Sequence, residues 1–405
     1  MTGPLGFDAD VSDAPAILFT SFEPSGDDHA SAVIAELVRR HPHVRIFAWG
    51  GPKMEAAGAE IVEHTGRDAV MGVPGIGKIL EHRSINKRIA AWLEHNPIRV
   101  HVPVDSPAAN FPICKLAKQA GARVVHLVAP QVWAWAGWRV HKLKRLTNFV
   151  CCVLPFEEQW FRERGVRARF VGHPLFDHPI NPDELDRIID RWPTGRPRLA
   201  LLPGSRPAEI RKNFPLLIAA YRQIAAEHPE MAGVAAVTRP EVEPVLRELA
   251  AAGGVWPPSL RVVSGQTDAA IRWADLCLVV SGTVTLQIAR QCKPMVIVYK
   301  SSWLAFNLIG RWLVTPPHFS LPNLIAGQEI VPELIPHFGG SDAIVHEAVG
   351  LLERPELVEQ QKSALAAIAS RFEGFHAAVN TADVIERAAG LVPASDLTPK
   401  PTSAP

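Results

Sequence analysis

The sequence carries almost no net charge: 42 Lys and Arg stand against 41 Asp and Glu, which leaves a formal charge of +1. Bulk nucleic-acid binding needs a concentrated basic footprint, so this balance argues against a nucleic-acid partner. No run approaches the roughly 18 apolar residues of a membrane-spanning helix. The first residues lack a basic stretch followed by an apolar run, so we expect no signal peptide. These absences favour a cytoplasmic protein, soluble or peripheral at a membrane.

Metal, disulfide and dinucleotide signatures are also missing. The cysteines show no CxxC and no metal-ligand spacing, the histidines form no HExxH, and the first apolar run is not followed by GxGxxG. We therefore expect no metal centre, no disulfide framework and no NAD fingerprint. Free, buried thiols in a reducing compartment are expected at Cys114, Cys151, Cys152, Cys277 and Cys292.

The sequence does contain short apolar runs that alternate with helical patterns such as 30–40 and 86–95. This alternation predicts βαβ units and mostly parallel sheets. A polar, proline-rich stretch at 176–197 separates two sets of runs and is expected to be a linker. The strand-like runs are 16–22, 45–50, 99–104, 123–128, 149–155 and 168–172, then 198–203, 233–238, 260–265, 276–282 and 294–300.

We predict an α/β protein with two Rossmann-like, doubly wound parallel-sheet domains, at 1–178 and 179–390, and a disordered tail at 391–405. The last helix, within 356–389, is a candidate to pack back on the first domain. Two such domains leave an interdomain cleft at the carboxyl ends of their sheets, which suits a shared ligand. Dehydrogenases, periplasmic-type binders and two-domain glycosyltransferases share this outline, so architecture alone does not choose among them.

The most informative segment is RLALLPGSRPAEI at 198–210, where a strand runs into a tight turn at Gly204 and Ser205 and then a helix. Free N–H groups at such a helix start attract phosphate. Arg206 adds a planar fork that fits a diphosphate, and Glu209 is placed to orient it or to cap the helix. The alternative is a plain strand, turn and helix with a surface arginine.

A second segment, VVSGTVTLQIA at 279–289, repeats this pattern. A strand ends, and Ser281, Gly282 and Thr283 then turn into a helix while presenting hydroxyl and N–H groups. The pattern predicts a second contact to phosphate or sugar. A simple helix N-cap is the alternative.

Two polar segments follow strand-like runs of the first domain, where open α/β folds place their chemistry. They are SFEPSGDDHA at 21–30 and PVDSPAANF at 103–111. The candidates that we take from them are Ser25, Gly26, Asp27, Asp105 and Asn110.

The segment APQVWAWAGWRVHKLKRL at 129–146 mixes tryptophans with basic residues. The aromatic rings could bracket a bulky ligand, and the basic residues could meet anionic head groups of a membrane. The alternative is a helix with an apolar stripe and a solvated basic face. His173, which follows a strand in VGHPL, is a ligand candidate or a structural loop histidine.

Taken in order, these segments resemble the lipid-A-disaccharide synthase family, from about residue 17 to about residue 335. The matching stretches are SGDDHA, GGPKMEAAG, VMGV, DSPAAN, PQVWAW, LPFE, FVGHPL, LPGSR with Glu209, SGTVTL, PMVIVYK, SLPNLIAG and VPELI. The resemblance implies a GT-B fold with the nucleotide sugar mainly on the C-terminal domain. It also implies an inverting transfer of diacylglucosamine from UDP to the 6-hydroxyl of diacylglucosamine 1-phosphate, giving a β-1,6 disaccharide.

The resemblance further implies that no cofactor or metal is used and that the partners are UDP-diacylglucosamine and a lipid acceptor. It places the protein at the inner face of the cytoplasmic membrane, with acyl chains near 70–79, and leaves a homodimer as an open alternative. Substrate contacts are implied at Ser25, Gly26, Asn110, Gln131, Trp133, His173, Gly204, Ser205, Arg206, Glu209, Ser281, Gly282, Thr283, Gln287, Asn323 and Glu333.

One departure from the family pattern affects the residue expected to act as the catalytic base. The family motif D-[AS]-P-D-F-N reads DSPAAN here, so Asp105, Pro107 and Asn110 match while the second aspartate, the family's candidate base, is Ala108. A methyl group cannot accept a proton. The remaining candidate bases are Asp105, Glu23 and Asp27.

Further departures lie in the expected pocket, whereas Arg206 is retained. Phe22 stands where the family usually has Gly, Ala129 where it has Ser, Gln287 where it has Glu, and Pro336 where it often has Gln. Three hypotheses remain open: an active synthase with a displaced base, a UDP-sugar transferase with another acceptor, and a non-catalytic paralogue that binds UDP-sugar or lipid.

Overall fold

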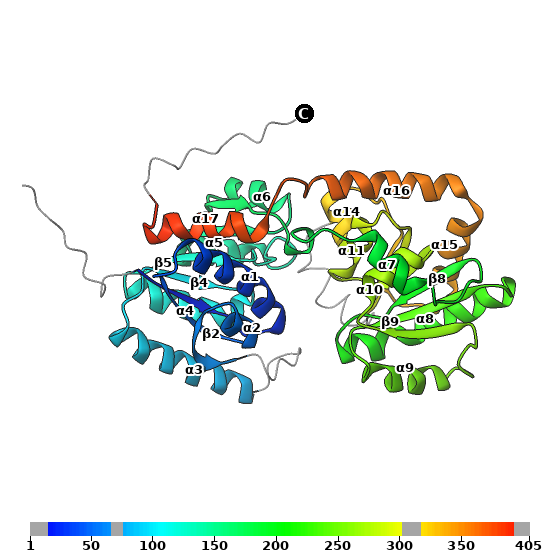
Figure 1. Cartoon of the computed structure of the whole chain (residues 1–405), viewed down its shortest axis with the longest axis horizontal. Helices are drawn as coiled ribbons and strands as arrows, with labels where there is room; N and C mark the ends of the chain where they lie inside the picture. Colours follow the sequence, from blue (N-terminus) through cyan, green and yellow to red (C-terminus); the bar gives the residue numbers. More distant parts are fainter. Residues whose placement is uncertain (1–14, 66–75, 302–316, 393–405) are drawn as a thin grey trace, which may run out of the picture. The chain divides into compact units, whose positions relative to one another are not determined.

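The computed structural model describes residues 15–65, 76–301 and 317–392, and these form two compact units. Of the described residues, the first unit holds 15–65, 76–132, 136–177 and 374–392, and the second holds 133–135, 178–301 and 317–373 (Figure 1). The expected acyl-chain surface at 70–79 and the expected tail lie largely outside the described residues.

Among the described residues of the first unit, seven strands form one sheet in the order β3-β2-β1-β4-β5-β6-β7. Every pairing in it is parallel. The strand order reverses between β1 and β4, which is the topological switch point where open α/β sheets bind ligands. The strands are β1 (Ala16–Thr20), β2 (Arg45–Gly50), β3 (Glu60–His64), β4 (Val100–Pro103), β5 (Arg123–Leu127), β6 (Phe149–Cys152) and β7 (Ala168–Phe170).

Helices cover this sheet, and several begin at a proline because its fixed φ suits the first helical position. Their apolar faces bury residues such as Ile34 and Leu37 against β-branched strand residues, as in other parallel sheets. The helices are α1 (Pro24–Arg40), α2 (Pro52–Ala56), α3 (Ile76–His95), α4 (Pro107–Gln119), α5 (Val140–Leu146), α6 (Glu157–Glu163) and α17 (Ala377–Ala389), with 3-10 turns at Gly137–Arg139 and Pro174–Phe176.

The second unit has its own parallel sheet, with six strands among the described residues in the order β10-β9-β8-β11-β12-β13. Its switch point lies between β8 and β11. The strands are β8 (Arg198–Leu202), β9 (Ala232–Val237), β10 (Leu260–Ser264), β11 (Leu276–Val280), β12 (Met295–Lys300) and β13 (Glu333–His337). The helices are α7 (Pro182–Ile189), α8 (Pro207–Glu227), α9 (Val242–Ala251), α10 (Thr267–Trp273), α11 (Val284–Arg290), α14 (Leu321–Ala326), α15 (Asp342–Glu353) and α16 (Pro355–Ser370).

The last helix, α17, belongs to the first unit and packs against α1 and β5 (Figure 1). Ile385 of α17 is fully buried in the core of that unit. The Asp177 carboxylate accepts the N–H groups of Ala377 and Ala378, at 2.7 and 3.1 Å, and so caps the start of α17. The chain therefore returns to the first unit at the place where it left it.

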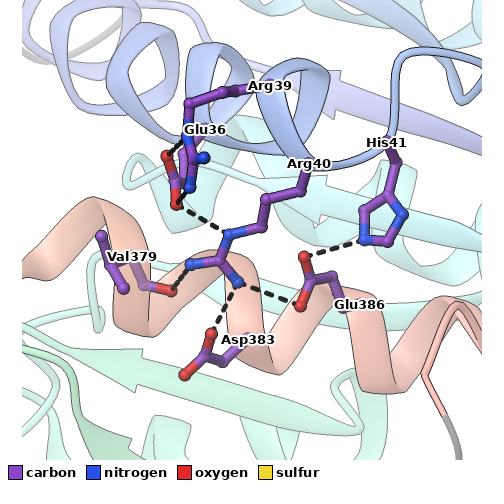
Figure 2. Close-up of polar contacts among 7 residues, drawn as sticks. All are labelled: Glu36, Arg39, Arg40, His41, Val379, Asp383 and Glu386. Atoms are coloured by element: carbon purple, nitrogen blue, oxygen red, sulfur yellow. Dashed lines mark hydrogen bonds and ion pairs between the residues drawn. The ribbon is translucent and has the colours of Figure 1, made fainter.

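An arginine cluster joins α17 to α1 (Figure 2). Arg40 donates to Glu36 at 2.7 Å, to Asp383 at 2.7 Å and to Glu386 at 3.1 Å. His41 adds a contact of 2.9 Å to Glu386, whose side chain is only 7% exposed. Because these charges lie at a partly buried helix contact, they are screened less than surface ion pairs.

The predicted pair of parallel sheets is confirmed, and the structure differs from the prediction at two sheet edges, in the linker, in the last helical stretch and at one cysteine. The edge strands β3 and β13 were not predicted: β3 has a mixed, half-exposed EIVEH pattern, and β13 contains Pro336. The expected linker contains helix α7, and the helical stretch predicted at 356–389 divides into α16 and α17. Of the five cysteines expected to be buried, Cys292 is only half-buried and the other four are buried.

Candidate active site

Two of the predicted segments lie side by side at the switch point of the second unit. The strands β8 and β11 are neighbours in the sheet, with Leu202 beside Val279. The loop 203–206 follows β8 and the loop 281–283 follows β11. Because parallel strands end at the same edge, both loops lie at the carboxyl edge where such folds hold nucleotides.

The loop after β8 is shaped by Gly204 and Arg206. Gly204 has φ +97°, a conformation that favours glycine, and a Cβ there would lie 3.3 Å from a carboxylate oxygen of Glu209. The Arg206 Nη1 donates to Glu209 at 2.9 Å. The Arg206 side chain is 48% exposed, so part of its fork remains open to a ligand. Glu209 thus orients Arg206, as one of the two expectations had it, while Ser205 is exposed beside them.

The loop after β11 is short and open. Ser281 donates its N–H to Val298 of β12 at 3.1 Å, which anchors the loop to the sheet. Gly282 and Thr283 are exposed, and a Cβ built on Gly282 meets no described atom within 4 Å. Gln287 is half-buried on α11. The loop therefore offers exposed backbone and hydroxyl groups at the same edge as Arg206.

Tyr299 and Lys212 were missed by the sequence reading. Tyr299 lies near the carboxyl end of β12, and Lys212 Nζ sits 5.5 Å from its ring centroid. Burial raises the pKa of Tyr299, with a further increase from the charge of Glu209. A phenol and an ammonium group thus adjoin the Arg206 pair. The available signal was the polar ending of the apolar run PMVIVYK.

The side chains of Asn323 and Glu333 are engaged within the protein. Glu333 accepts hydrogen bonds from the N–H groups of Phe319 and Ser320, at 2.9 and 3.0 Å, and from Asn323 at 2.9 Å. Asn323 is fully buried and accepts the N–H of Ile330 at 2.8 Å. These hydrogen bonds hold α14 to β13. Neither residue lies in the loops at 203–206 and 281–283.

The first unit has a second switch-point site between β1 and β4, and its backbone is strained. Asp105 and Ser106 follow β4 with φ +46° and +33°, and Val128 follows β5 with φ +59°. Left-handed backbone costs a non-glycine residue on the order of 1–3 kcal/mol, and such strain gathers at functional sites. This edge of the sheet is therefore built to hold one unfavourable loop shape.

The Asn110 side chain holds the loop after β4 through hydrogen bonds. It is fully buried on α4, and its Nδ2 donates to the carbonyl oxygens of Val104 and Asp105, both at 3.0 Å. The Ser106 hydroxyl donates to the Glu23 carboxylate, which joins the loops after β1 and β4. The structure thus brings together Glu23, Asp105 and Asn110, three of the predicted residues.

The Asp27 carboxylate is engaged in backbone hydrogen bonds. It accepts the N–H groups of Gly51, Lys53 and Met54, each at 3.1 Å, and so caps α2. This geometry supports a structural role rather than proton abstraction. Gly26 lets α1 lie close to the Ser21 side chain, since a Cβ at residue 26 would lie 2.3 Å from the Ser21 hydroxyl oxygen. Ser25 is exposed in the first turn of α1.

Ala108, the position of the missing acid, is exposed in the first turn of α4. Only its methyl group faces outward there, so this residue supplies no base. An aspartate would fit without burial, and its charge would favour a helix start. Asp105 and Glu23 are the carboxylates nearest in sequence and loop contact to this turn.

The remaining predicted residues are His173 and Gln131 in the first unit and Trp133, which belongs to the second. The His173 Nδ1 accepts the N–H of Leu175 at 3.1 Å, and the His29 ring lies 6.3 Å from its own. Burial, followed by the nearby His29, lowers the pKa of His173 to about 3, so the ring is neutral. Gln131 is exposed and Trp133 is buried.

Within residues 15–65, 76–301 and 317–392, no three His, Cys, Asp or Glu side chains are grouped so as to hold a metal ion. In the same part of the chain, no helix is both long enough and apolar enough to span a bilayer.

Comparison with known proteins identifies what the chain resembles. Residues 17–377 match the family model described as lipid-A-disaccharide synthetase. The lipid-A-disaccharide synthase of Anaeromyxobacter sp. (strain K) is 36% identical over 361 residues, covering 86% of this chain and 91% of that protein. The enzyme of the same name from Geobacter sulfurreducens is 32% identical over 383 residues, covering 93% and 96%.

Solved structures support the fold. The glycotransferase of kitacinnamycin superposes with a TM-score of 0.64 at 18% identity, covering 93% of this chain and 99% of that one. The S. aureus MnaA–UDP co-structure gives a TM-score of 0.63 at 11% identity, covering 93% and 98%. The two parallel sheets are thus those of the GT-B fold.

Proposed function

The chain belongs to the lipid-A-disaccharide synthase family of glycosyltransferases, and from this premise we propose how its two switch-point sites divide the reaction. The family's substrates are UDP-diacylglucosamine and a diacylglucosamine 1-phosphate acceptor. The second unit takes the nucleotide sugar and the first takes the acceptor. The observation that carries the proposal is the family match across 17–377 together with the retained Arg206 pair at the β8–β11 switch point.

On the donor side, the task is to stabilise charge on departing UDP. Arg206 uses one N–H on Glu209 and turns the rest of its fork to the diphosphate. The backbone at Gly204 and the exposed Gly282 and Thr283 add N–H and hydroxyl donors, and Gln287 takes a ribose hydroxyl. Preorganised donors of this kind act without reorganising during the reaction, which is where their rate benefit arises.

On the acceptor side, a hydroxyl must lose its proton as it attacks. The acceptor oxygen forms a bond to the anomeric carbon, the carbon–oxygen bond to UDP breaks on the opposite face, and its electron pair leaves with the diphosphate. The hydroxyl proton passes to a base. Asp105 is our choice because Ala108 has no acceptor atom, the Asp27 carboxylate caps α2, and Asp105 begins the loop that Asn110 holds at the switch point of the first unit.

A second candidate function is favoured by one observation, the exposed methyl group of Ala108. A chain that lost its base and gained none would bind UDP-sugar or lipid without turnover. A transferase with another acceptor is the third reading, and it predicts UDP release when a different lipid or sugar is supplied.

The deciding experiment incubates purified protein with UDP-2,3-diacylglucosamine and 2,3-diacylglucosamine 1-phosphate and looks for disaccharide by mass spectrometry. We expect product from the wild type, and loss of product with unchanged UDP affinity in Asp105→Asn. Ala108→Asp runs alongside, and Asp183→Asn, at an exposed position in the first turn of α7, is the control. UDP binding without product in both wild type and Ala108→Asp would reject catalysis in favour of the binding paralogue.

We also propose that the first unit meets the anionic inner face of the cytoplasmic membrane. Trp138 is 72% exposed. The following helix α5 buries its apolar stripe and leaves Lys142, Lys144 and Arg145 exposed. An exposed tryptophan beside a basic helix face suits the interface of an anionic bilayer.

A further inference from the structure

The loop after β4 is connected to a buried row of hydrogen-bonded side chains that the sequence analysis did not predict. Thr20 ends β1, His101 lies in β4 and Asn110 lies in α4, and all three are fully buried. Thr20 Oγ1 is 2.8 Å from His101 Nε2 and 2.7 Å from Asn110 Oδ1. Asn110 then contacts the two carbonyl groups that begin the strained loop. The Asn110 amide therefore links Thr20 to the loop, and His101 contacts the Thr20 hydroxyl from β4.

The direction of each hydrogen bond follows from counting protons. Asn110 faces two carbonyl oxygens with its nitrogen, so its NH₂ group points to the loop and its Oδ1 must accept from Thr20. Thr20 has one hydroxyl proton, which this bond uses. The Thr20 oxygen therefore accepts from His101, whose ring carries its proton on Nε2.

The state of His101 fits this assignment. Burial, and then the neighbouring His126 ring, lower the pKa of His101 to about 3, so the ring is neutral at working pH. Its Nδ1 has no hydrogen-bond partner among the described residues. An unpaired buried acceptor is tolerated better than an unpaired N–H, which again places the proton on Nε2. The chain of donors thus runs in one direction, from His101 to the loop.

We propose that Thr20 and His101 are positioning residues for the transfer reaction. They fix the Asn110 amide, the amide fixes the carbonyl groups of Val104 and Asp105, and this holds Asp105 at its left-handed φ. This inference rests on the proposed role of Asp105 as the base. It extends that role inward, to two residues that touch no substrate.

The physical reason is that the loop has no intrinsic preference for its shape. Asp105 and Ser106 are not glycines, so their left-handed backbone relaxes unless contacts hold it. Without the Thr20 hydroxyl, the Asn110 oxygen loses its donor and the amide is free to turn. A base displaced by about 1 Å costs up to about a hundredfold in rate, because proton transfer depends steeply on distance.

The test compares Thr20→Val with Thr20→Ser and with the matched control Thr147→Val. Thr147 is also a buried threonine of the first unit, and its hydroxyl donates to a backbone carbonyl at 2.9 Å, away from the loop. We expect Thr20→Val to lower kcat about 10- to 100-fold and leave the KM for the UDP-sugar within about twofold. Thr20→Ser restores most of kcat, and Thr147→Val retains it.

A second readout does not depend on activity. The Asp105 N–H donates to the Leu127 carbonyl at 3.0 Å, so its hydrogen exchange reports the loop shape. We expect faster exchange in Thr20→Val than in Thr147→Val. Should Thr20→Val fail to fold, His101→Phe is the second variant, since it removes the donor that fixes the Thr20 hydroxyl and keeps an aromatic ring; we expect a change in the same direction with a smaller loss of kcat.

The outcomes separate this inference from the proposed function. An active wild type with unchanged kcat in Thr20→Val overturns the positioning role. An inactive wild type overturns the proposed function and with it the catalytic part of this inference, and the exchange of the Asp105 amide then tests whether Thr20 holds the loop. Equal exchange in the two valine variants would reject the inference, and selective loosening in Thr20→Val would support it.

Discussion

Replacing Arg40 with alanine tests how α17 is held to the first unit. The change removes donors to Glu36, Asp383 and Glu386 and leaves Glu386, which is 7% exposed, with only its His41 contact. Breaking a buried pair from one side costs about 3–5 kcal/mol. Arg40 keeps 19% of its side chain exposed, so we expect the lower end, about 3 kcal/mol, in the free energy of opening α17.

The neighbouring Arg39 is a matched control. It also donates to Glu36, at 2.8 Å, but its side chain is 70% exposed. An exposed ion pair contributes less than about 1 kcal/mol, so Arg39→Ala should have little effect. The two variants share a helix, a side chain type and one acceptor, and they differ in burial and in contact with α17.

Native-state hydrogen exchange of the α17 amides is the assay, because it reads local opening and does not require two-state unfolding of a two-unit chain. About 3 kcal/mol corresponds to about a hundredfold loss of protection in Arg40→Ala. Arg39→Ala should lose less than about fivefold. Equal losses in both variants, or none in Arg40→Ala, would refute the idea that the buried cluster anchors this helix.

Three further predictions follow from contacts described above. Hydrogen bonds from Arg39 and, against the effect of burial, from Arg40 lower the pKa of Glu36 to about 2. The pKa of Glu36 is thus lower in the folded protein than in the unfolded chain, so its contribution to stability should be complete above about pH 4.5 and be lost as the pH falls toward 2. The urea midpoint of Glu36→Gln should not show this part of the pH dependence. Arg206→Ala should weaken UDP binding about 10- to 100-fold by calorimetry, whereas Arg211→Ala, also exposed and one turn further along α8, should stay within about twofold. Trp138→Ser should lower cosedimentation with anionic vesicles, whereas Val255→Ser, at a position that is 89% exposed, should not.

The donor loops could be predicted because each follows a short buried run that ends abruptly in small and polar residues. The run before Gly204 and the run before Ser281 have this pattern. Their adjacency could not be predicted in the same way, since it depends on strand order. The sheet places β8 beside β11 through hydrogen bonds between segments far apart in the chain. The pattern of apolar and polar residues within each segment does not tell which strands pair.

The roles of single side chains were harder to predict than their locations. Asp27 was a candidate base, and only the folded loop before α2 brings three N–H groups to its carboxylate. Thr20 and His101 gave no signal, because a threonine or histidine in an apolar run is compatible with many buried environments. Such roles arise from tertiary contacts, and a linear pattern does not encode those contacts.

The capping of α17 by Asp177 has a consequence for protein synthesis. The ribosome releases the strands of the first unit before it makes the second unit, yet the helix that buries Ile385 in their core emerges only after the second unit. Domains generally fold as they are made, starting from the N-terminus. Here the first unit waits, with an apolar strip uncovered, until the second has been translated. A stop codon placed between the second unit and α17 would therefore damage the part of the protein that is made first.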